Sequence, residues 1–242
     1  MQKLNEAYYK VKRLLGEQTE SLESVQLVET YRRLLKPEKI RVILLAESHV
    51  FTHDADRKVP IPPIPDLPGY PAQYARFVYC LGYGEKNLTR SAIHPNRDGT
   101  PQFWKIFFSC CNHVFSSDDF HPILGQTPAK QRIENKIRIL KRLKDQGIWL
   151  VDASIVALYK DSKKIPNMSQ ALEESWKSYT RDVVISANPE HVICIGKGVA
   201  VVVEADLKKN FPSRYTVIAQ PNAFLSSEEH MANYKMYSKI CN

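Results

Sequence analysis

The sequence lacks any uninterrupted apolar run of about eighteen residues, the length that a membrane-spanning helix requires. The stretch from Met1 to Glu6 also lacks the apolar core of a secretory signal peptide. Together these absences predict a cytoplasmic protein that has no membrane partner.

Cysteine is scarce as well. The five cysteines are Cys80, Cys110, Cys111, Cys194 and Cys241. Their number is odd and none are spaced as C-x-x-C, which argues against a disulfide framework or a zinc site. We therefore expect free thiols, no metal ion and no other cofactor.

Basic side chains are in excess. Lysine and arginine number 34 against 26 aspartates and glutamates, a formal net charge of +8 at pH 7. A basic domain attracts polyanions, of which DNA is the commonest, so the charge favours a nucleic-acid partner. The alternative, that the excess serves only solubility, remains open at this point. The 242 residues and the 43% hydrophobic fraction suit one domain with one substantial core.

Short apolar runs alternate with amphipathic segments along the chain. Strands are predicted at 40–45, 148–151, 191–195 and 215–219. Helices are predicted at 1–36, 102–115, 128–146 and 169–187, in a short segment after Gly198, and from Ser227 onward. This alternation predicts a single α/β domain over residues 1–242, with a three-layer α-β-α architecture around a mainly parallel sheet of about four strands.

The helix at 128–146 has an apolar face and a basic face. The basic side chains are Arg132, Lys136, Lys141, Arg142 and Lys144. Such a face is more often solvated surface than a binding site, and that is the expectation here.

A long proline-rich segment, residues 46–74, follows the first predicted strand. Irregular segments of this length inside a domain are usually functional or disordered, and its place after a buried strand favours an active-site loop. In parallel sheets, ligands bind beyond the carboxyl ends of the strands. The candidate site residues therefore lie at 46–50, 152, 196–198 and 220–222.

Four motifs occupy these strand ends in order. They are Ala46-Glu47-Ser48-His49-Val50, Gln146-Gly147-Ile148-Trp149-Leu150-Val151-Asp152, Val192-Ile193-Cys194-Ile195-Gly196 and Gln220-Pro221-Asn222-Ala223-Phe224-Leu225. In order and spacing they resemble the uracil-DNA glycosylase superfamily across residues 38–226. The resemblance implies that fold and an enzyme that flips a nucleotide out of double-stranded DNA and hydrolyses its N-glycosidic bond. The ordinary alternative is an α/β domain whose strands end in polar residues.

The resemblance assigns the catalytic role to Glu47 and Gln220, with two departures. Ser48 stands where the family usually has its catalytic aspartate, and Glu47 matches the glutamate of the G-E-x-P-G branch. His49, Asp54 and Asp56 are alternatives to Glu47, and a role for Glu47 in shaping its loop stays open. Gln220 replaces the histidine of the last loop and is expected to donate a hydrogen bond to the leaving base. The iron–sulfur branches need four cysteine ligands, mostly near the N-terminus, where this sequence has none, so no cluster is expected.

Asp152 occupies the base-reading position, where uracil enzymes have asparagine. A carboxylate only accepts hydrogen bonds, so it suits the exocyclic amine of cytosine and repels O4 of uracil. A mismatched buried polar pair costs on the order of 1–3 kcal/mol, enough to reverse a preference. The alternative is that Asp152 caps the next helix.

The resemblance also assigns residues that would leave room for a substituent at C5 of the base, stack on the base and contact the DNA. Val50 replaces a tyrosine that excludes 5-substituents, which indicates a modified cytosine such as the glucosylated hydroxymethylcytosine of phage DNA and an antiviral role. Phe77 or Tyr79 is expected to stack on the base, unless either belongs to the core. Residues expected to contact the DNA are Ser48, Lys197, Asn222, Phe224, Leu225, Ser226 and Ser227, with Phe224 or Leu225 filling the gap in the helix.

Three alternative functions remain open besides excision of modified cytosine by a monomeric enzyme. One is a uracil-DNA glycosylase with an unusual pocket. Another, suggested by Ser48 and Gln220, is a modified-DNA binding protein of the same fold that does not cleave. The third is a small-molecule hydrolase that uses the carboxylates at the strand ends.

Overall fold

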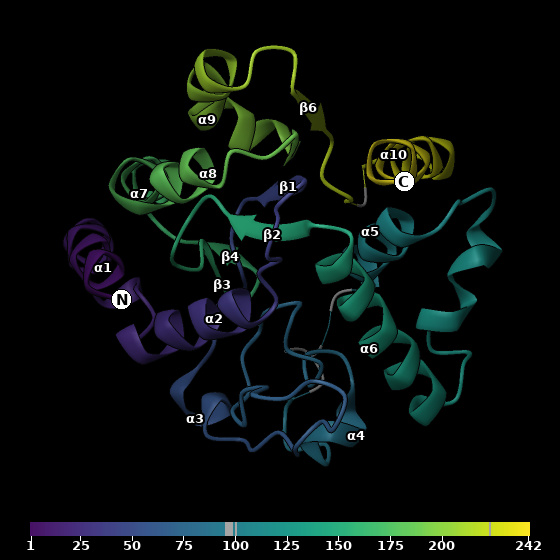
Figure 1. Ribbon diagram of the computed structural model, residues 1–242. Helices are drawn as coiled ribbons and strands as arrows, with labels where there is room; N and C mark the ends of the chain where they lie inside the picture. Colours follow the sequence, from purple (N-terminus) through teal and green to yellow (C-terminus); the bar gives the residue numbers. More distant parts are fainter. Residues whose placement is uncertain (95–98, 100, 223) are drawn as a thin grey trace.

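A computed structural model describes residues 1–94, 99, 101–222 and 224–242 (Figure 1). Its central sheet has four parallel strands in the order β2-β1-β5-β6. They are β1 (Val42–Ala46), β2 (Ile148–Asp152), β5 (His191–Ile195) and β6 (Tyr215–Ile218). The register pairs Ala46 with Asp152, so the first two strands end at the same level. The parallel four-stranded sheet predicted from the sequence is confirmed.

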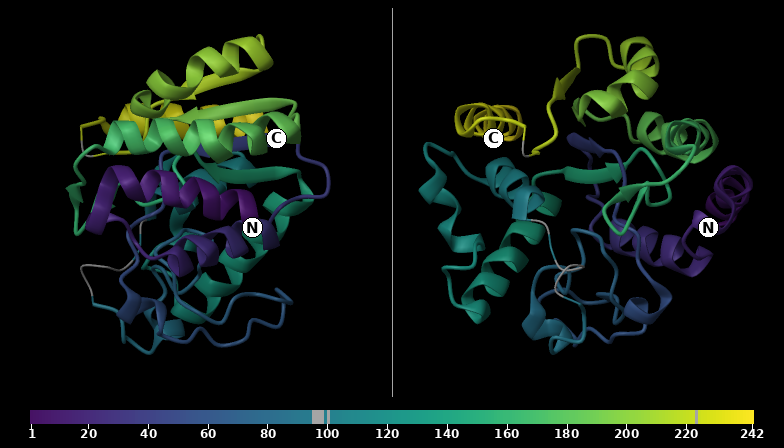
Figure 2. Two further views of the ribbon diagram at one scale, coloured as in Figure 1. Left: turned by 90° about the vertical axis from the view of Figure 1, so that its left-hand side faces the viewer. Right: turned by 180° about the vertical axis from the view of Figure 1, so that it is seen from behind.

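Helices cover both faces of this sheet (Figures 1 and 2). One face packs against α5 (Pro101–Cys111), α6 (Ala129–Asp145) and α10 (Ser227–Cys241). The other packs against α1 (Gln2–Leu15), α7 (Met168–Ser175), α8 (Arg181–Ala187) and α9 (Lys197–Asn210). Because alternate residues of β1 enter the two cores, all five of its residues are buried, which explains the unbroken apolar run in the sequence. The three-layer fold is confirmed.

Several helices differ from their predicted form. The 1–36 segment is two helices, α1 and α2 (Leu22–Leu34), separated by a 3₁₀ turn at Gly16–Gln18. The 169–187 helix is interrupted by a π-helical turn at Trp176–Thr180, and the expected short helix after Gly198 is the 14-residue α9. Elements absent from the prediction are α3 (Asp54–Arg57), α4 (Lys86–Thr89), the 3₁₀ segment Ser117–Ile123 and the antiparallel hairpin of β3 (Tyr159–Lys160) and β4 (Lys163–Lys164).

The basic face of α6 is not wholly solvated, so that expectation was wrong at its first turns. Arg132 and Lys136 both donate to the carboxylate of Glu85, at 2.7 Å and 2.6 Å, and Glu85 is fully buried. A buried glutamate requires such partners because an unpaired buried charge is costly. These two cations therefore anchor α6 to the segment that precedes α5.

The proline-rich segment 46–74 is irregular apart from α3, yet it is packed. Ile61, Ile64 and Leu67 are buried in the core that contains α5 and α6. The hydroxyl of Tyr31, on α2, donates to the backbone carbonyl of Gln73 at 2.7 Å. The segment is thus packed against α2 and the core that contains α5 and α6.

Candidate functional site

The sheet has a topological switch point at the carboxyl ends of β1, β2 and β5. β1 leads to helices on one face of the sheet, whereas its neighbours β2 and β5 lead to helices on the other. Parallel α/β sheets bind ligands in the crevice that such a switch creates.

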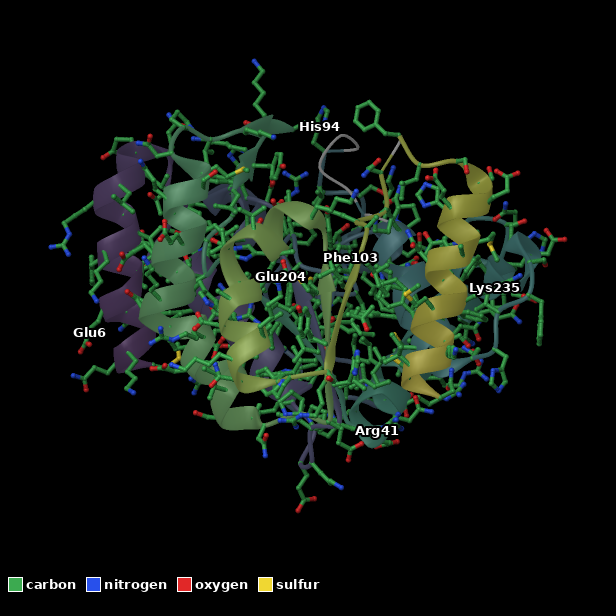
Figure 3. All side chains as sticks on the ribbon, turned by 90° about the horizontal axis from the view of Figure 1, so that it is seen from above. Glu6, Arg41, His94, Phe103, Glu204 and Lys235 are labelled. Atoms are coloured by element: carbon green, nitrogen blue, oxygen red, sulfur yellow. The ribbon has the colours of Figure 1, made fainter. Side chains whose placement is uncertain are left out.

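A cavity of about 180 Å³ lies at this position. We call it the strand-end pocket; its lining residues are Glu47, Ser48, His49, Val50, Arg76, Phe77, Val78, Tyr83, Phe103, Leu150, Asp152, Tyr159 and Gln220. In Figure 3, Phe103 of α5 is seen well inside the outline of the molecule. The predicted residues Glu47, Asp152 and Gln220, which are far apart in the sequence, are therefore brought together.

A second cavity of about 320 Å³ adjoins the first. We call it the loop cavity; it is lined by Glu47, Gly196, Lys197, Gly198, Val199, Ala219, Gln220, Asn222, Phe224 and Leu225. Glu47 and Gln220 line both cavities. The two residues predicted to be catalytic therefore stand at the junction between the strand-end pocket and a larger cavity.

Asp152 is almost fully buried at the end of β2 and is held by a cation. Its Oδ2 accepts a hydrogen bond from Nη2 of Arg32 at 3.0 Å, and Arg32 also donates to Glu29 at 2.7 Å. No described residue donates to Oδ1, and Asp152 lines the strand-end pocket. The helix-capping alternative is wrong, because the next helix begins only at Met168.

His49 is fully buried between two carboxylates. Its Nε2 lies 2.6 Å from Oε1 of Glu20, and its Nδ1 lies 3.6 Å from Oδ2 of Asp152, an ion-pair distance rather than a hydrogen bond. Burial alone would lower the pKa of His49, but the charges of Glu20 and Asp152 outweigh it and raise the pKa to about 9. The imidazole is therefore a cation at neutral pH.

Glu47 follows β1 and is half-buried. Burial raises its pKa above the ordinary value; Lys164 of β4 opposes the shift and Asp152 adds to it. A carboxyl group with a raised pKa exchanges protons closer to neutral pH, which suits acid–base chemistry. The alternatives Asp54 and Asp56 line neither the strand-end pocket nor the loop cavity.

The two candidate stacking residues have different environments. Phe77 lines the strand-end pocket, and its ring centre lies 5.6 Å from Cζ of Arg32. Tyr79 does not line it: its hydroxyl accepts a hydrogen bond from the Leu150 amide at 2.8 Å, and its ring stacks on Phe107. Tyr79 is therefore a core residue that braces β2, and of the two candidates only Phe77 lines the strand-end pocket.

The last loop carries an apolar side chain on the surface. Phe224 is 97% exposed, and its amide donates to Oδ1 of Asn222 at 2.8 Å, which shapes the turn. Lys197 is exposed at the start of α9. Leu225 is half-buried, and Ala223 lies outside the described residues.

Two of the predicted DNA contacts already have structural partners. Oγ of Ser226 accepts a hydrogen bond from the Glu229 amide at 3.2 Å and caps α10. Oγ of Ser48 accepts one from the Leu158 amide at 3.3 Å. Ser227 is the first residue of α10. The serine hydroxyls at 48 and 226 thus shape the loops of the site.

Several residues of the site escaped the sequence reasoning. Arg32 and Glu20 lie on or before α2, and Arg76, Tyr83 and Phe103 follow the proline-rich segment. None of them belongs to a strand-end motif, and charged or aromatic residues of this kind are common on ordinary helices and loops. Only their three-dimensional placement distinguishes them.

Comparison with known proteins found no matching family model, no matching curated protein and no matching solved structure. Within the described ranges, no group of three or more histidine, cysteine or acidic side chains is placed to hold a metal ion. The same ranges contain no helix that is both long and apolar enough to span a membrane.

Proposed function

We propose that this protein is a DNA glycosylase that excises a modified cytosine-type base from double-stranded DNA and leaves an abasic site. The observation that carries the proposal is the position of Glu47 and Gln220 at the junction of the two cavities. A flipped base in the strand-end pocket and its sugar–phosphate in the loop cavity would place the N-glycosidic bond beside these two side chains.

The proposed chemistry uses both side chains. As the bond between base and sugar breaks, positive charge develops on the sugar and negative charge on the leaving base. The Glu47 carboxylate stabilises the sugar cation and takes a proton from the attacking water, which adds its oxygen to the anomeric carbon. The Gln220 amide donates a hydrogen bond to the departing base, which carries the bonding electrons away.

The pocket supplies the preference for the base. Oδ1 of Asp152 accepts from the exocyclic amine of cytosine, because Oδ2 is engaged with Arg32. Phe77 offers an aromatic face or edge to the ring, and Val50 at the pocket wall leaves room for a 5-substituent. The net charge of +8 and the exposed Phe224 support binding to a duplex from which a nucleotide is extruded.

The direct test uses duplexes that contain a single uracil, cytosine, 5-hydroxymethylcytosine or glucosylated 5-hydroxymethylcytosine. Each is incubated with a molar excess of protein, and abasic sites are cleaved with alkali and counted on a gel. We expect cleavage at a modified cytosine and little at uracil, with Glu47→Gln as the inactive control. The absence of abasic product from every duplex would overturn the proposal.

A non-cleaving DNA-binding protein is the second candidate. It is favoured by one observation. Ser48 and Gln220 stand where the family has its catalytic aspartate and histidine, and neither side chain is an acid or a base. Of the two described residues that line both cavities, Glu47 and Gln220, only Glu47 can therefore exchange a proton. Tight, selective binding to a modified duplex without any abasic product would establish this function instead. Preferential cleavage at uracil would identify a uracil-DNA glycosylase.

A further inference from the structure

Arg76 is a buried cation in the strand-end pocket. Only 7% of the residue is exposed, and it lines the cavity beside Phe77 and Val50. Its Nη1 donates to the carbonyl of Phe51 at 3.3 Å, while its Nε is buried without a partner. Among the described residues, no carboxylate forms an ion pair with it.

The other buried cations among the described residues are compensated. Arg32 has the carboxylates of Glu29 and Asp152, Lys136 has that of Glu85, and His49 lies between Glu20 and Asp152. An uncompensated buried charge is strongly destabilising. Arg76 differs from these cations because it lines a cavity without forming an ion pair with any carboxylate of the described residues. A ligand in that cavity would complete the ion pair.

The backbone fixes the position of Arg76. Its amide donates to Oγ1 of Thr52 at 2.9 Å, and its carbonyl accepts from the Val50 amide at 3.0 Å. Cζ lies 6.0 Å from the ring centre of Tyr83, which also lines the pocket. The backbone of Arg76 is thus held beside Val50, and both residues line the wall where the proposed function places the 5-substituent of the base.

We propose that Arg76 is the receptor for an oxyanion carried by the ligand of the strand-end pocket. The planar fork of a guanidinium matches carboxylate and phosphate oxygens in pairs, and few other ligand groups compensate its charge. The inference deepens the proposed function and rests on it for the carrier of the oxyanion. The proposed function places the sugar–phosphate in the loop cavity, which Arg76 does not line, so an anionic 5-substituent of the base is the expected carrier. The phosphate of the nucleotide is the alternative source, which the test distinguishes.

Titration calorimetry with small probes tests the anion site without any catalysis. Inorganic phosphate is titrated into the wild-type protein, Arg76→Gln, Arg76→Lys and the control Arg138→Gln. Arg138 is exposed on α6 and donates only to Asn135. We expect at least a tenfold loss of phosphate affinity in Arg76→Gln, a smaller loss in Arg76→Lys and no change in Arg138→Gln.

Two further arms identify the carrier. If the base carries the oxyanion, 5-carboxy-2′-deoxycytidine binds at least tenfold more tightly than 5-methyl-2′-deoxycytidine, and Arg76→Gln removes the difference. If the nucleotide phosphate carries it, deoxycytidine 5′-monophosphate shows that advantage over deoxycytidine instead. Either result supports the inference and selects one source.

Equal affinities of wild type and Arg76→Gln for all anionic probes would overturn the inference. If Arg76→Gln does not fold, the Nε–H signal of Arg76 is followed in the NMR spectrum of the wild-type protein instead. An unchanged chemical shift at saturating phosphate would then overturn the inference. These binding results do not depend on cleavage. A protein that produces no abasic sites but binds anions through Arg76 would retain this inference and lose the proposed function.

Discussion

The Asp152 carboxylate belongs to a chain of buried charges, which alternates in sign from Glu20 through His49, Asp152 and Arg32 to Glu29. Removing one member of a buried ion pair strands its partner and typically costs about 3–5 kcal/mol. The chain thus holds Oδ2 of Asp152 between Arg32 and His49, and no described residue donates to Oδ1.

We expect Asp152→Asn to weaken excision of cytosine-type bases and to improve excision of uracil. An asparagine amide can donate to O4 of uracil, and the mismatch it relieves is worth roughly 1–3 kcal/mol, or about 5- to 150-fold in the ratio of rates. Single-turnover rates on paired duplexes measure that ratio. The control is Glu29→Gln, which disturbs Arg32 without lining the pocket. An unchanged ratio in Asp152→Asn would contradict base reading by Asp152.

Glu47→Gln is expected to lower the rate of cleavage by about 100-fold or more, the usual contribution of a general base, with little change in DNA affinity. Because the pKa of Glu47 is raised, the carboxylate is lost as the pH falls through that raised value. The wild-type rate should therefore decline on the acid side at a pH above the ordinary glutamate value of 4.5. Full activity in Glu47→Gln would transfer the role to another group.

The pKa of His49 links stability to pH. The pKa is about 9 in the folded protein, against an ordinary 6.5, so protonation of His49 stabilises the folded state. This stabilisation is fully present below pH 6.5 and is lost as the pH rises through 9. We expect the free energy of unfolding, from urea titrations, to fall by about 3 kcal/mol across this window. His49→Gln should abolish the slope, whereas the exposed His121→Gln should keep it. Equal slopes in wild type and His49→Gln would show that His49 is not the linked group.

At the scale of elements, the site is assembled by loops that follow strands. The connection after β2 turns back as the β3–β4 hairpin, which brings Lys164 near enough to Glu47 to act on its pKa. The connection after β6 presents Phe224 to solvent before the capping box of Ser226 and Glu229 starts α10. The strands thus fix the pocket, and the loops supply the group that would approach DNA.

Phe224→Ala is the prediction that belongs to this last loop. Because the side chain is 97% exposed, its loss should change the free energy of unfolding by less than about 0.5 kcal/mol. Excision from duplex DNA should fall roughly tenfold, since filling a gap in the stack is worth about 1–3 kcal/mol. Phe115→Ala, at another highly exposed phenylalanine, is the matched control. Equal loss of excision in both variants would refute a specific role for the loop.

At the scale of the whole molecule, two distant parts of the chain complete the site. The turn before α2 supplies Glu20, and α2 itself supplies Arg32, which also accepts a hydrogen bond at its carbonyl from Nε1 of Trp149 on β2. The N-terminal part of the chain therefore contributes to the architecture of the candidate site. Deleting them would strand both His49 and Asp152.

The net charge of +8 leads to a prediction for the molecule as a whole. Binding to DNA releases counterions, so for about four phosphate contacts a rise from 50 to 200 mM salt weakens binding by roughly two orders of magnitude. Fluorescence anisotropy with a labelled duplex measures this slope. The magnitude of the slope of log affinity against log salt concentration should fall by about one in Lys197→Gln. It should stay unchanged in Lys3→Gln, where the replaced lysine is exposed on α1. A flat salt dependence would mean that the charge serves solubility alone.

Much of the sheet was predictable because burial on both faces makes a strand an apolar run. The prediction for β5 was correct at both ends, and the prediction for β2 missed only Asp152. Helix lengths and interruptions were less predictable, because the π-helical turn at Trp176–Thr180 has no characteristic sequence pattern. The hairpin at 159–164 was missed because its strands are polar and very short.

The sequence by itself determined where the strands end to within one residue, because the period of apolar side chains is a local property of the chain. From that alone, Glu47, Asp152 and Gln220 were expected to meet at one edge of the sheet. Only the tertiary structure decided how they are charged and held. The partners of Asp152 and His49 come from segments distant in the chain. That Arg76 has no carboxylate partner among the described residues is likewise visible only in space. These contacts join parts of the chain that only folding brings together, so no spacing in the sequence encodes them.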